Sequence, residues 1–221
     1  MKAISASILS ADFRRLEDEI IKVQEAGVDY IHIDVMDGVF VPNITIGPMI
    51  VKAVKKVAEI PLDVHLMIVN PDRFIDMFVD SGSDILTVHA EASVHLHRTI
   101  TYIKGKGIKA GVSLNPTTSL DLLEYILDEL FMVLVMTVNP GFEAQPFIPS
   151  MLRKIERLRK MIDSRGLDTK IEVDGGIGIG NIREVADAGA DIFVTGSSLF
   201  YSQDYRETVR AMKAKISSKK D

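Results

Sequence analysis

Eight short apolar runs, each followed by a longer stretch with helical spacing, restrict the fold of this sequence more than any other feature. The runs cover residues 3–9, 30–36, 62–68, 84–90, 109–115, 132–138, 170–176 and 191–197. The helical candidates lie near 12–26, 47–58, 71–81, 93–106, 118–129, 149–165, 178–188 and 202–217. Such alternation predicts a parallel sheet, whose strands are buried on both faces and therefore read as continuous apolar runs.

The number of repeats decides between two parallel architectures. A doubly wound open sheet also alternates, but eight repeats within 221 residues favour a closed barrel. We therefore predict a single-domain (β/α)8 TIM barrel over residues 1–221. The active site of such a barrel lies at the carboxyl ends of its strands. The final residues, SSKKD, are expected to fray.

Composition excludes several classes of function. The net charge of -5 argues against nucleic acid or an anionic membrane as the main partner. The chain has no cysteine, so any metal must be bound by His, Asp, Glu or backbone oxygen. Residues 1–30 lack a secretory pattern, and no apolar stretch approaches the ~20 residues of a membrane span. We expect a cytoplasmic protein.

The second apolar run carries two ligand-type residues near its end. Strand alternation places His32, Asp34 and Met36 on one face, and Ile33 and Val35 on the other. Groups at positions i and i+2 can share one metal ion. A hydrogen-bonded His–Asp pair lining the barrel is an equally good interpretation of these two residues alone, although a buried carboxylate needs a partner.

The third run repeats this arrangement. His65 lies two residues before Met67 and so faces the same way. A lone inward histidine is more often a satisfied core residue. The repetition of a ligand-type residue followed by methionine on neighbouring strands nevertheless favours a shared site.

The seventh run ends in an aspartate followed by two glycines. Asp174 precedes Gly175 and Gly176, which let backbone approach a ligand. The alternative role for Asp174 is a helix N-cap. Strand seven is nearly opposite strands two and three in an eight-stranded ring, so Asp34 and Asp174 can face each other across a small substrate. Four residues then form a plausible ligand set for Zn²⁺, Fe²⁺, Mn²⁺ or Co²⁺: His32, Asp34, His65 and Asp174.

Glycines and serines in the last two strand-to-helix loops suggest a phosphate site. Barrels often bind phosphate there through backbone N–H groups. The candidates are Gly175, Gly176, Gly178, Gly196 and Ser197. Ordinary turn chemistry explains either loop alone, but both together favour phosphate. The sixth loop, residues 139–147, is either a lid over the mouth or a rigid proline-containing turn.

Other strand ends are less informative. Met36, Met67 and Met136 end strands two, three and six. Residue type alone favours ordinary core packing, and the alternative is an apolar wall that excludes water from a reactive intermediate. Four further polar residues near strand ends have no distinct role: His89, Glu91, Asn115 and Asn139.

Six segments resemble the signature stretches of the ribulose-phosphate 3-epimerase family, in the family's order and over nearly the whole chain. They are SASILSADF (5–13), HIDVMDGVFVPN (32–43), DVHLM (63–67), MTVNPGF (136–142), VDGGI (173–177) and GSSLF (196–200). The resemblance implies an isomerase of the pentose phosphate pathway that interconverts D-ribulose 5-phosphate and D-xylulose 5-phosphate.

The resemblance also assigns roles to residues. It implies one divalent metal ion on His32, Asp34, His65 and Asp174, with Asp34 and Asp174 as the two acid/base groups. The substrate contacts implied are Ser7, Met36, His65, Met67, Met136, Gly141, Phe142, Glu143, Ala144, Asp174, Gly175, Gly176, Gly196 and Ser197. Epimerisation then removes a C3 proton on one face and returns one on the other, through an enediolate.

One loop departs from the family pattern. The family's sixth loop usually reads GFGGQ, whereas this chain has Gly141-Phe142-Glu143-Ala144-Gln145. A carboxylate beside a phosphate dianion is unfavourable unless it points to solvent, which puts phosphate affinity in doubt.

Two alternatives stay open at this point, and a third is disfavoured. A related ketose phosphate such as D-allulose 6-phosphate is a second substrate candidate, because QPFIP follows the sixth loop. A non-catalytic sugar-phosphate binding barrel belongs to another class. A Schiff-base aldolase lacks an inward lysine, since Lys109 and Lys170 lie at strand starts. We also expect a homo-oligomer, either a dimer or a hexamer.

Overall fold

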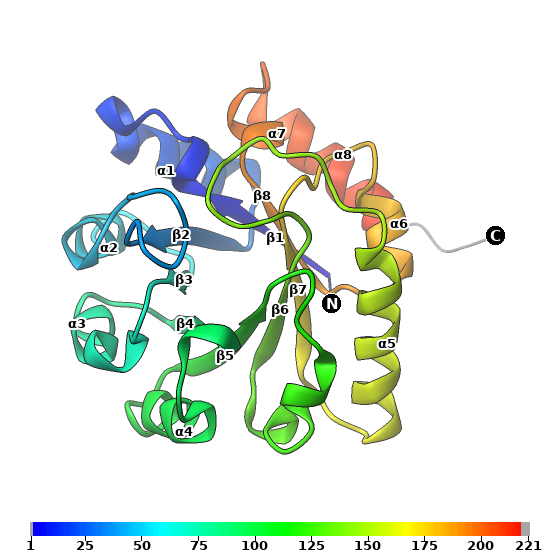
Figure 1. Cartoon of the computed structure of the whole chain (residues 1–221). Helices are drawn as coiled ribbons and strands as arrows, with labels where there is room; N and C mark the ends of the chain where they lie inside the picture. The colour runs from blue at the N-terminus through cyan, green and yellow to red at the C-terminus, as the bar shows by residue number, and fades with distance from the viewer. Residues whose placement is uncertain (1, 218–221) are drawn as a thin grey trace.

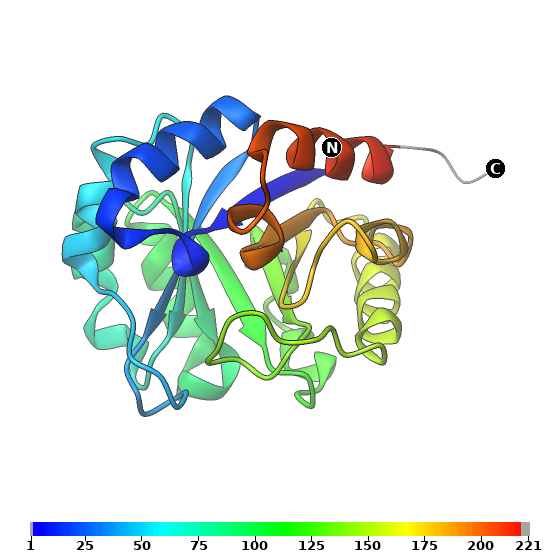
Figure 2. The same cartoon turned by 90° about the horizontal axis from the view of Figure 1, so that it is seen from above.

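Eight parallel strands close into a barrel in chain order, with β8 pairing with β1 (Figures 1 and 2). The structure, a computed structural model, describes residues 2–217; residue 1 and residues 218–221, and with them most of the tail expected to fray, lie outside the described residues. The strands are β1 (Ala3–Ser7), β2 (Tyr30–Met36), β3 (Leu62–Met67), β4 (Ile85–His89), β5 (Lys109–Leu114), β6 (Met132–Met136), β7 (Lys170–Asp174) and β8 (Ile192–Thr195). The predicted barrel is confirmed.

The helices surround the strands (Figure 1). They are α1 (Leu16–Ala26), α2 (Pro48–Lys55), α3 (Ile75–Asp80), α4 (Leu96–Gly105), α5 (Met151–Ser164), α6 (Ile182–Asp187), α7 (Ser197–Phe200) and α8 (Tyr205–Ser217). Short 3-10 turns add η1 (Ile8–Ser10), η2 (Phe13–Arg15), η3 (Pro71–Arg73) and η4 (Ala90–Ala92). Within residues 2–217, no helix combines the length and apolar character needed to cross a membrane.

The predicted helix over 118–129 is wrong. This segment forms two 3-10 turns, η5 (Leu120–Leu123) and η6 (Leu127–Glu129). The buried leucines Leu120, Leu123 and Leu127 have a spacing that also fits an α-helix, so spacing alone did not separate the two helix types. The Ser119 side chain accepts a hydrogen bond from the Asp121 N–H and so starts the first turn. The short helix α7 was not predicted.

Strand alternation separates two environments. Ile33 and Val35 belong to the large apolar cluster that also contains helix residues such as Ile20 and Val51. His32 and Asp34, also on β2, are buried but take part in the polar contacts described below. The predicted division of β2 into two faces is therefore confirmed.

Strand register brings the polar residues of the mouth side by side. Asp34 pairs with His65, and Met36 pairs with Met67, between β2 and β3. Between β6 and β7, Met136 pairs with Asp174. Residues far apart in the chain thus end their strands at a common level, and this level forms the floor of the site.

Candidate active site and metal centre

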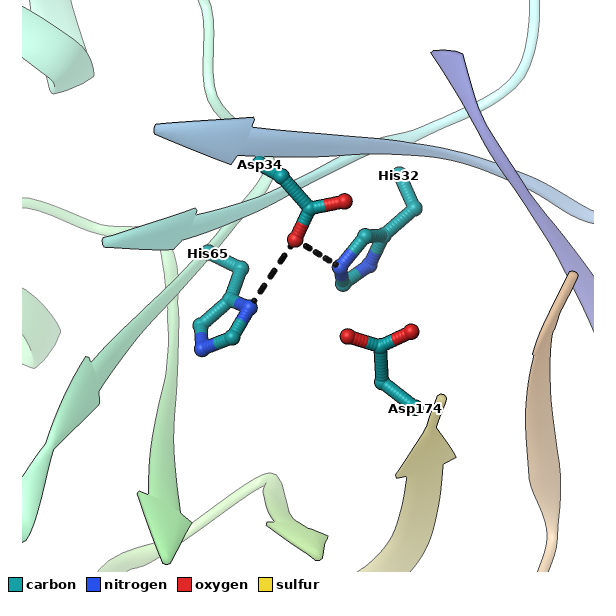
Figure 3. Close-up of side chains that lie close together, drawn as sticks. All are labelled: His32, Asp34, His65 and Asp174. Carbon is teal, nitrogen blue, oxygen red and sulfur yellow. Dashed lines mark hydrogen bonds and ion pairs between the residues drawn. The ribbon is translucent and has the colours of Figure 1, made fainter. Parts of the chain in front are cut away.

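Four side chains converge at the barrel mouth. His32 and Asp34 come from β2, His65 from β3 and Asp174 from β7 (Figure 3). One ligand atom from each lies within 4.8 Å of the others. Figure 3 shows the Asp174 carboxylate facing the group formed by the other three. The structure therefore brings together the four residues that sequence reasoning proposed as metal ligands.

Asp34 is the hydrogen-bonding centre of this group. Its Oδ1 lies 3.2 Å from His32 Nε2 and 3.1 Å from His65 Nδ1, and its Oδ2 accepts a 2.7 Å hydrogen bond from the Ser7 hydroxyl. Burial raises the pKa of Asp34, but the charge of His32 leads the opposing causes, and the net pKa lies well below its usual range. Asp34 is therefore ionised and held in one orientation.

Asp174 is held differently. Its backbone oxygen accepts hydrogen bonds from the N–H and the hydroxyl of Thr137, at 2.7 and 2.9 Å. Among the described residues, none donates a hydrogen bond to its carboxylate. Burial and the nearby charge of Asp34 raise the pKa of Asp174 to about 7. The two aspartates are thus unequal: one is ionised and fixed, and the other is poised to hold or release a proton.

A carboxylate below the floor orients His32. The Asp63 Oδ2 lies 2.6 Å from His32 Nδ1, so this nitrogen donates and Nε2 points toward Asp34. Burial lowers the pKa of His32, but Asp34 and Asp63 raise it more, well above its usual value. The negative charges of Asp34 and Asp63 therefore favour a protonated His32 ring. A divalent cation at the same place would balance these negative charges instead of that proton. Two imidazoles and two carboxylates are a common donor set for first-row divalent metals, so the residues fit such an ion.

A second acidic group lies deeper in the barrel. His32, Asp63 and Glu172 also form a cluster of ligand-type atoms, all buried. Burial, followed by the charge of Asp63, raises the pKa of Glu172 well above its usual value. A carboxyl group that stays protonated is a poor metal ligand, so the group at the mouth is the better centre.

One cavity opens above the four residues. Asp34 and Asp174 line it together with the following predicted substrate contacts: Ser7, Met36, Met67, Met136, Gly141, Phe142, Glu143, Ala144, Gly175, Gly176, Gly196 and Ser197. His65, the remaining predicted contact, is fully buried and does not line the cavity. The methionines occupy two sides: Met36 and Met67 pack with Val41, and Met136 packs with Leu134 and Val138.

Two glycines allow the sixth loop to lie against β7. A Cβ on Gly175 would come within 2.4 Å of Val138, and one on Gly176 within 2.5 Å of the Phe147 backbone nitrogen. Both also have positive φ, at 116° and 68°. Any side chain at either position would push the loop away from the cavity, which explains the need for glycine here.

The sixth loop, within residues 137–150, contains no helix or strand and is drawn as the long irregular segment that follows β6 (Figure 1). The Asn43 amide donates a 2.9 Å hydrogen bond to the Gly141 carbonyl, which ties the loop to the β2–α2 connection. Ala144 has a φ of 56°, in the left-handed region where a non-glycine residue costs roughly 1 kcal/mol. The replacement of glycine at this position therefore stores strain at the tip of the loop.

Glu143 is exposed, but its carboxylate is hydrogen-bonded at the edge of the cavity. Its carboxylate accepts hydrogen bonds from the Ser10 hydroxyl, at 2.5 Å, and from the Tyr201 hydroxyl, at 3.0 Å. The Ser10 hydroxyl lies beside Gly196, at 2.9 Å from the position of an added Cβ. The carboxylate thus occupies the edge of the cavity where the sequence predicted phosphate. Sequence reasoning missed Ser10 and Tyr201, because neither lies at a strand end.

His89, at the end of β4, and Glu91, which follows it, extend the contacts of His65. His65 Nε2 lies 2.9 Å from His89 Nε2, and His89 Nδ1 lies 3.1 Å from Glu91 Oε2. Burial lowers the pKa of both histidines, that of His65 to about 4, so both rings are neutral at physiological pH. The sequence showed that His89 and Glu91 lie near a strand end, but it did not show this contact.

Sequence comparison links the chain to known proteins. A profile of the ribulose-phosphate 3 epimerase family matches residues 3–200. The ribulose-phosphate 3-epimerase of Synechocystis sp. is 53% identical over 212 residues, which cover 95% of this chain and 92% of that protein. The ribulose-phosphate 3-epimerase of Bacillus subtilis is 53% identical over 210 residues, covering 95% of this chain and 97% of that protein.

Structural comparison adds the fold alone. A crystal structure of KGPDC from Streptococcus mutans has a TM-score of 0.73 at 13% identity, covering 98% of this chain and 97% of the other. A 3-hexulose-6-phosphate synthase has a TM-score of 0.69 at 19% identity, covering 98% of this chain and 100% of the other. At such identities the likeness concerns the barrel and not its chemistry.

Proposed function

The chain belongs to the ribulose-phosphate 3-epimerase family, and on that premise we propose that it interconverts D-ribulose 5-phosphate and D-xylulose 5-phosphate. One observation carries the proposal. Two carboxylates with different protonation behaviour, Asp34 and Asp174, meet from different strands at the floor of a single cavity. Epimerisation next to a ketone needs such a pair, because a proton leaves one face of the carbon and another arrives on the opposite face.

The carboxylates divide the work according to their environments. Asp34 is ionised and fixed by Ser7, so it removes the C3 proton from the face that it contacts. Asp174, whose pKa is about 7, delivers a proton to the other face. The roles exchange in the reverse direction. A pKa near the working pH suits a group that must both hold and release a proton.

His32, Asp34, His65 and Asp174 would hold one divalent cation, Zn²⁺, Fe²⁺, Mn²⁺ or Co²⁺. When bound, it would supply Lewis-acid stabilisation of the negative charge that develops on the substrate oxygens. Asp63 keeps the His32 ring in the orientation that such binding needs, through its 2.6 Å contact with Nδ1.

The methionines protect the reacting carbon from water. Met36, Met67 and Met136 line the cavity around Asp34 and Asp174, and their own exposure is 5% or less. An enediolate that meets water is protonated without control of the face. Three apolar side chains at the floor therefore favour proton exchange with the aspartates over exchange with solvent.

The phosphate would lie at the other end of the cavity. Gly176, Gly196 and Ser197 line this end, and α7 begins at Ser197. Backbone N–H groups of glycine-containing loops bind anions without a lysine. Residues 141–144 line the same end of the cavity. Glu143 brings a carboxylate to this end.

Isotope exchange tests the reaction and its substrate. The chain is incubated in D₂O with D-ribulose 5-phosphate and, separately, with D-allulose 6-phosphate. We expect deuterium at C3 and the formation of xylulose 5-phosphate from the first, at a much higher kcat/KM than any reaction of the second. Preference for the hexulose would replace the proposed substrate. Binding without exchange of either sugar would show a sugar-phosphate binding protein instead of an enzyme.

We also propose self-association, which extends the expectation of a dimer or hexamer. Exposed apolar side chains follow β2 and β3, among them Val39, Ile44, Met49 and Met77, each more than half exposed. Exposed apolar side chains are frequent at interfaces between subunits. Light scattering during gel filtration gives the oligomeric state; a monomer at micromolar concentration would contradict the proposal. The cytoplasmic location stays a prediction.

A further inference from the structure

Two side chains, His89 and Glu91, connect the proposed metal ligand His65 to the rim of the mouth. The rings of His65 and His89 stack with their centroids 5.0 Å apart, and Phe40 also packs against His89, at 4.6 Å. The nitrogen contacts described above continue this chain from His65 through His89 to Glu91. The proton transfer proposed above does not use His89 or Glu91, although His89 is completely buried next to the centre.

Glu91 is anchored as an acceptor. Its Oε1 accepts hydrogen bonds from the Asn115 N–H, at 2.7 Å, and from the Thr118 hydroxyl, which leaves Oε2 for His89. Burial raises the pKa of Glu91, but the hydrogen bonds from His89, Thr118 and Asn115 lower it more, to about 2. An ionised carboxylate has no proton to donate, so every contact that it makes must be donated by the partner.

This requirement places the protons along the chain. Because Glu91 only accepts, His89 Nδ1 must carry a hydrogen. A His65 ring that binds a cation through Nδ1 carries its hydrogen on Nε2, so His89 Nε2 must accept that hydrogen across their 2.9 Å contact. The contacts from Glu91 through His89 thus agree with a His65 ring that has no hydrogen on Nδ1. The lone pair of His65 Nδ1 is directed toward Asp34 Oδ1, 3.1 Å away. Both atoms are then acceptors, and a cation bound to both of them would offset their repulsion.

We propose that Glu91 and His89 are positioning residues for the metal centre, which fix the tautomer and orientation of His65 so that its Nδ1 can bind a divalent cation. This inference rests on the metal site of the proposed function. Carboxylates or carbonyls that accept a hydrogen bond from the second nitrogen of a ligating histidine are common, and their loss typically weakens metal binding by about 10–100-fold. Here a second histidine extends that arrangement by one step.

Glu91→Gln keeps the size of the side chain but should reverse the donor and acceptor roles along His89 and His65. In Glu91→Gln the remaining oxygen is needed by the Asn115 N–H and the Thr118 hydroxyl, so the amide NH₂ faces His89 Nδ1. That nitrogen must then accept, and the hydrogen of His89 moves to Nε2. His65 Nε2 must accept in turn, which puts a hydrogen on His65 Nδ1 and blocks the atom proposed to bind metal.

Metal affinity provides the first measurement. Full-length protein is freed of metal by chelation and titrated with Co²⁺, which is followed by its visible absorption and by calorimetry. We expect Glu91→Gln to raise the dissociation constant about 10–100-fold and to change the absorption spectrum. His89→Phe keeps the stacked ring but loses both nitrogens, so it should weaken binding by a smaller factor.

Thr118→Val is the matched control. It removes one donor to Glu91 but leaves the contact with His89, so it should leave the Co²⁺ dissociation constant within about twofold of the original. Equal weakening in Thr118→Val and Glu91→Gln would show that loosening of the loop, and not tautomer reversal, is responsible. Unchanged affinity in both Glu91→Gln and His89→Phe would overturn the inference.

Nitrogen NMR provides a second measurement that does not depend on metal. The chain has five histidines, so ¹⁵N-labelled imidazole signals can be assigned one by one. We expect His89 to carry its hydrogen on Nδ1 in the original protein and on Nε2 in Glu91→Gln. The same tautomer in both proteins would contradict the proposal. Failure of the original protein to bind Co²⁺ would instead remove the metal site while the tautomer test still decides the role of Glu91.

Discussion

The two ends of the cavity are built in different ways. At the metal end, His32, Asp34 and His65 belong to paired strands, are at most 3% exposed and contact one another directly. At the anion end, Gly141–Ala144, Gly176 and Gly196 belong to loops and offer mainly backbone. The position of a strand residue is fixed by the many backbone hydrogen bonds of the sheet, whereas the position of a loop residue depends on a few local contacts. The metal end should therefore tolerate little change, and the anion end more.

The largest expected effect tests the metal end. Asp34→Asn and Asp174→Asn should each lower kcat by about a thousandfold or more, because one of the two proton-transfer groups is lost. The thermal unfolding midpoint should show that each variant is folded. Asp18→Asn, an exposed change on α1, is the matched control and should keep full turnover. More than a tenth of the original kcat in either active-site variant would contradict the two-carboxylate mechanism.

Metal removal is the second test of this end. Dialysis against a chelator should lower kcat by roughly a thousandfold, since Lewis-acid stabilisation contributes several kcal/mol. Addition of Zn²⁺, Mn²⁺, Co²⁺ or Fe²⁺ should restore turnover, and elemental analysis of the untreated protein identifies the resident ion. A preparation free of metal by that analysis and still fully active would show that the four ligand-type residues serve proton transfer alone.

The raised pKa of Asp174 predicts a pH-dependent stability of the metal-free protein. In the folded state its pKa is about 7, against a reference of 3.8, so its stabilising effect is complete below about pH 4 and is lost as pH rises to 7. Metal-free Asp174→Asn should therefore exceed the original protein in unfolding free energy by about 1–3 kcal/mol at pH 8, where each pKa unit corresponds to ~1.4 kcal/mol.

Urea unfolding at pH 4.5 and pH 8 measures this difference. The advantage of Asp174→Asn should shrink at the lower pH and should vanish at pH 8 once the original protein is saturated with metal. A constant difference between the two proteins at both pH values would show that Asp174 has an ordinary pKa.

The smallest expected effect concerns the anion end. Glu143→Gln removes a negative charge at the edge of the predicted phosphate site, so KM should fall about 3–10-fold while kcat changes little. Glu124→Gln, an exposed change between η5 and η6, is the matched control. A rise in KM would indicate instead that the hydrogen bonds of Glu143 to Ser10 and Tyr201 hold the loop in its binding position.

Sequence reasoning was most accurate where residue spacing corresponds directly to structure. Alternation of apolar runs predicted the closed barrel, and alternation within β2 predicted that His32 and Asp34 face away from Ile33 and Val35. It failed at residues 118–129, where the chain forms two 3-10 turns instead of the predicted helix. Local spacing does not distinguish these helix types when tertiary packing decides which side chains are buried.

Contacts between distant segments could not be predicted in this way. The Glu143 carboxylate meets Ser10 and Tyr201, which lie 133 and 58 residues away, and no pattern near any of the three residues announces the contact. The same holds for Asp63 beneath His32 and for His89 beside His65. Each of these partners is brought to the mouth by barrel closure.

The sequence by itself determined the architecture, the family and the residue types available for chemistry, because hydrophobic periodicity and motif order are properties of the chain alone. Only the tertiary structure decided how those groups behave. Burial, strand register and neighbouring charges give Asp34 a lowered pKa and Asp174 a raised one, although both are aspartates at the ends of strands. Protonation depends on the surroundings of a group in three dimensions, and those surroundings exist only once the barrel has closed.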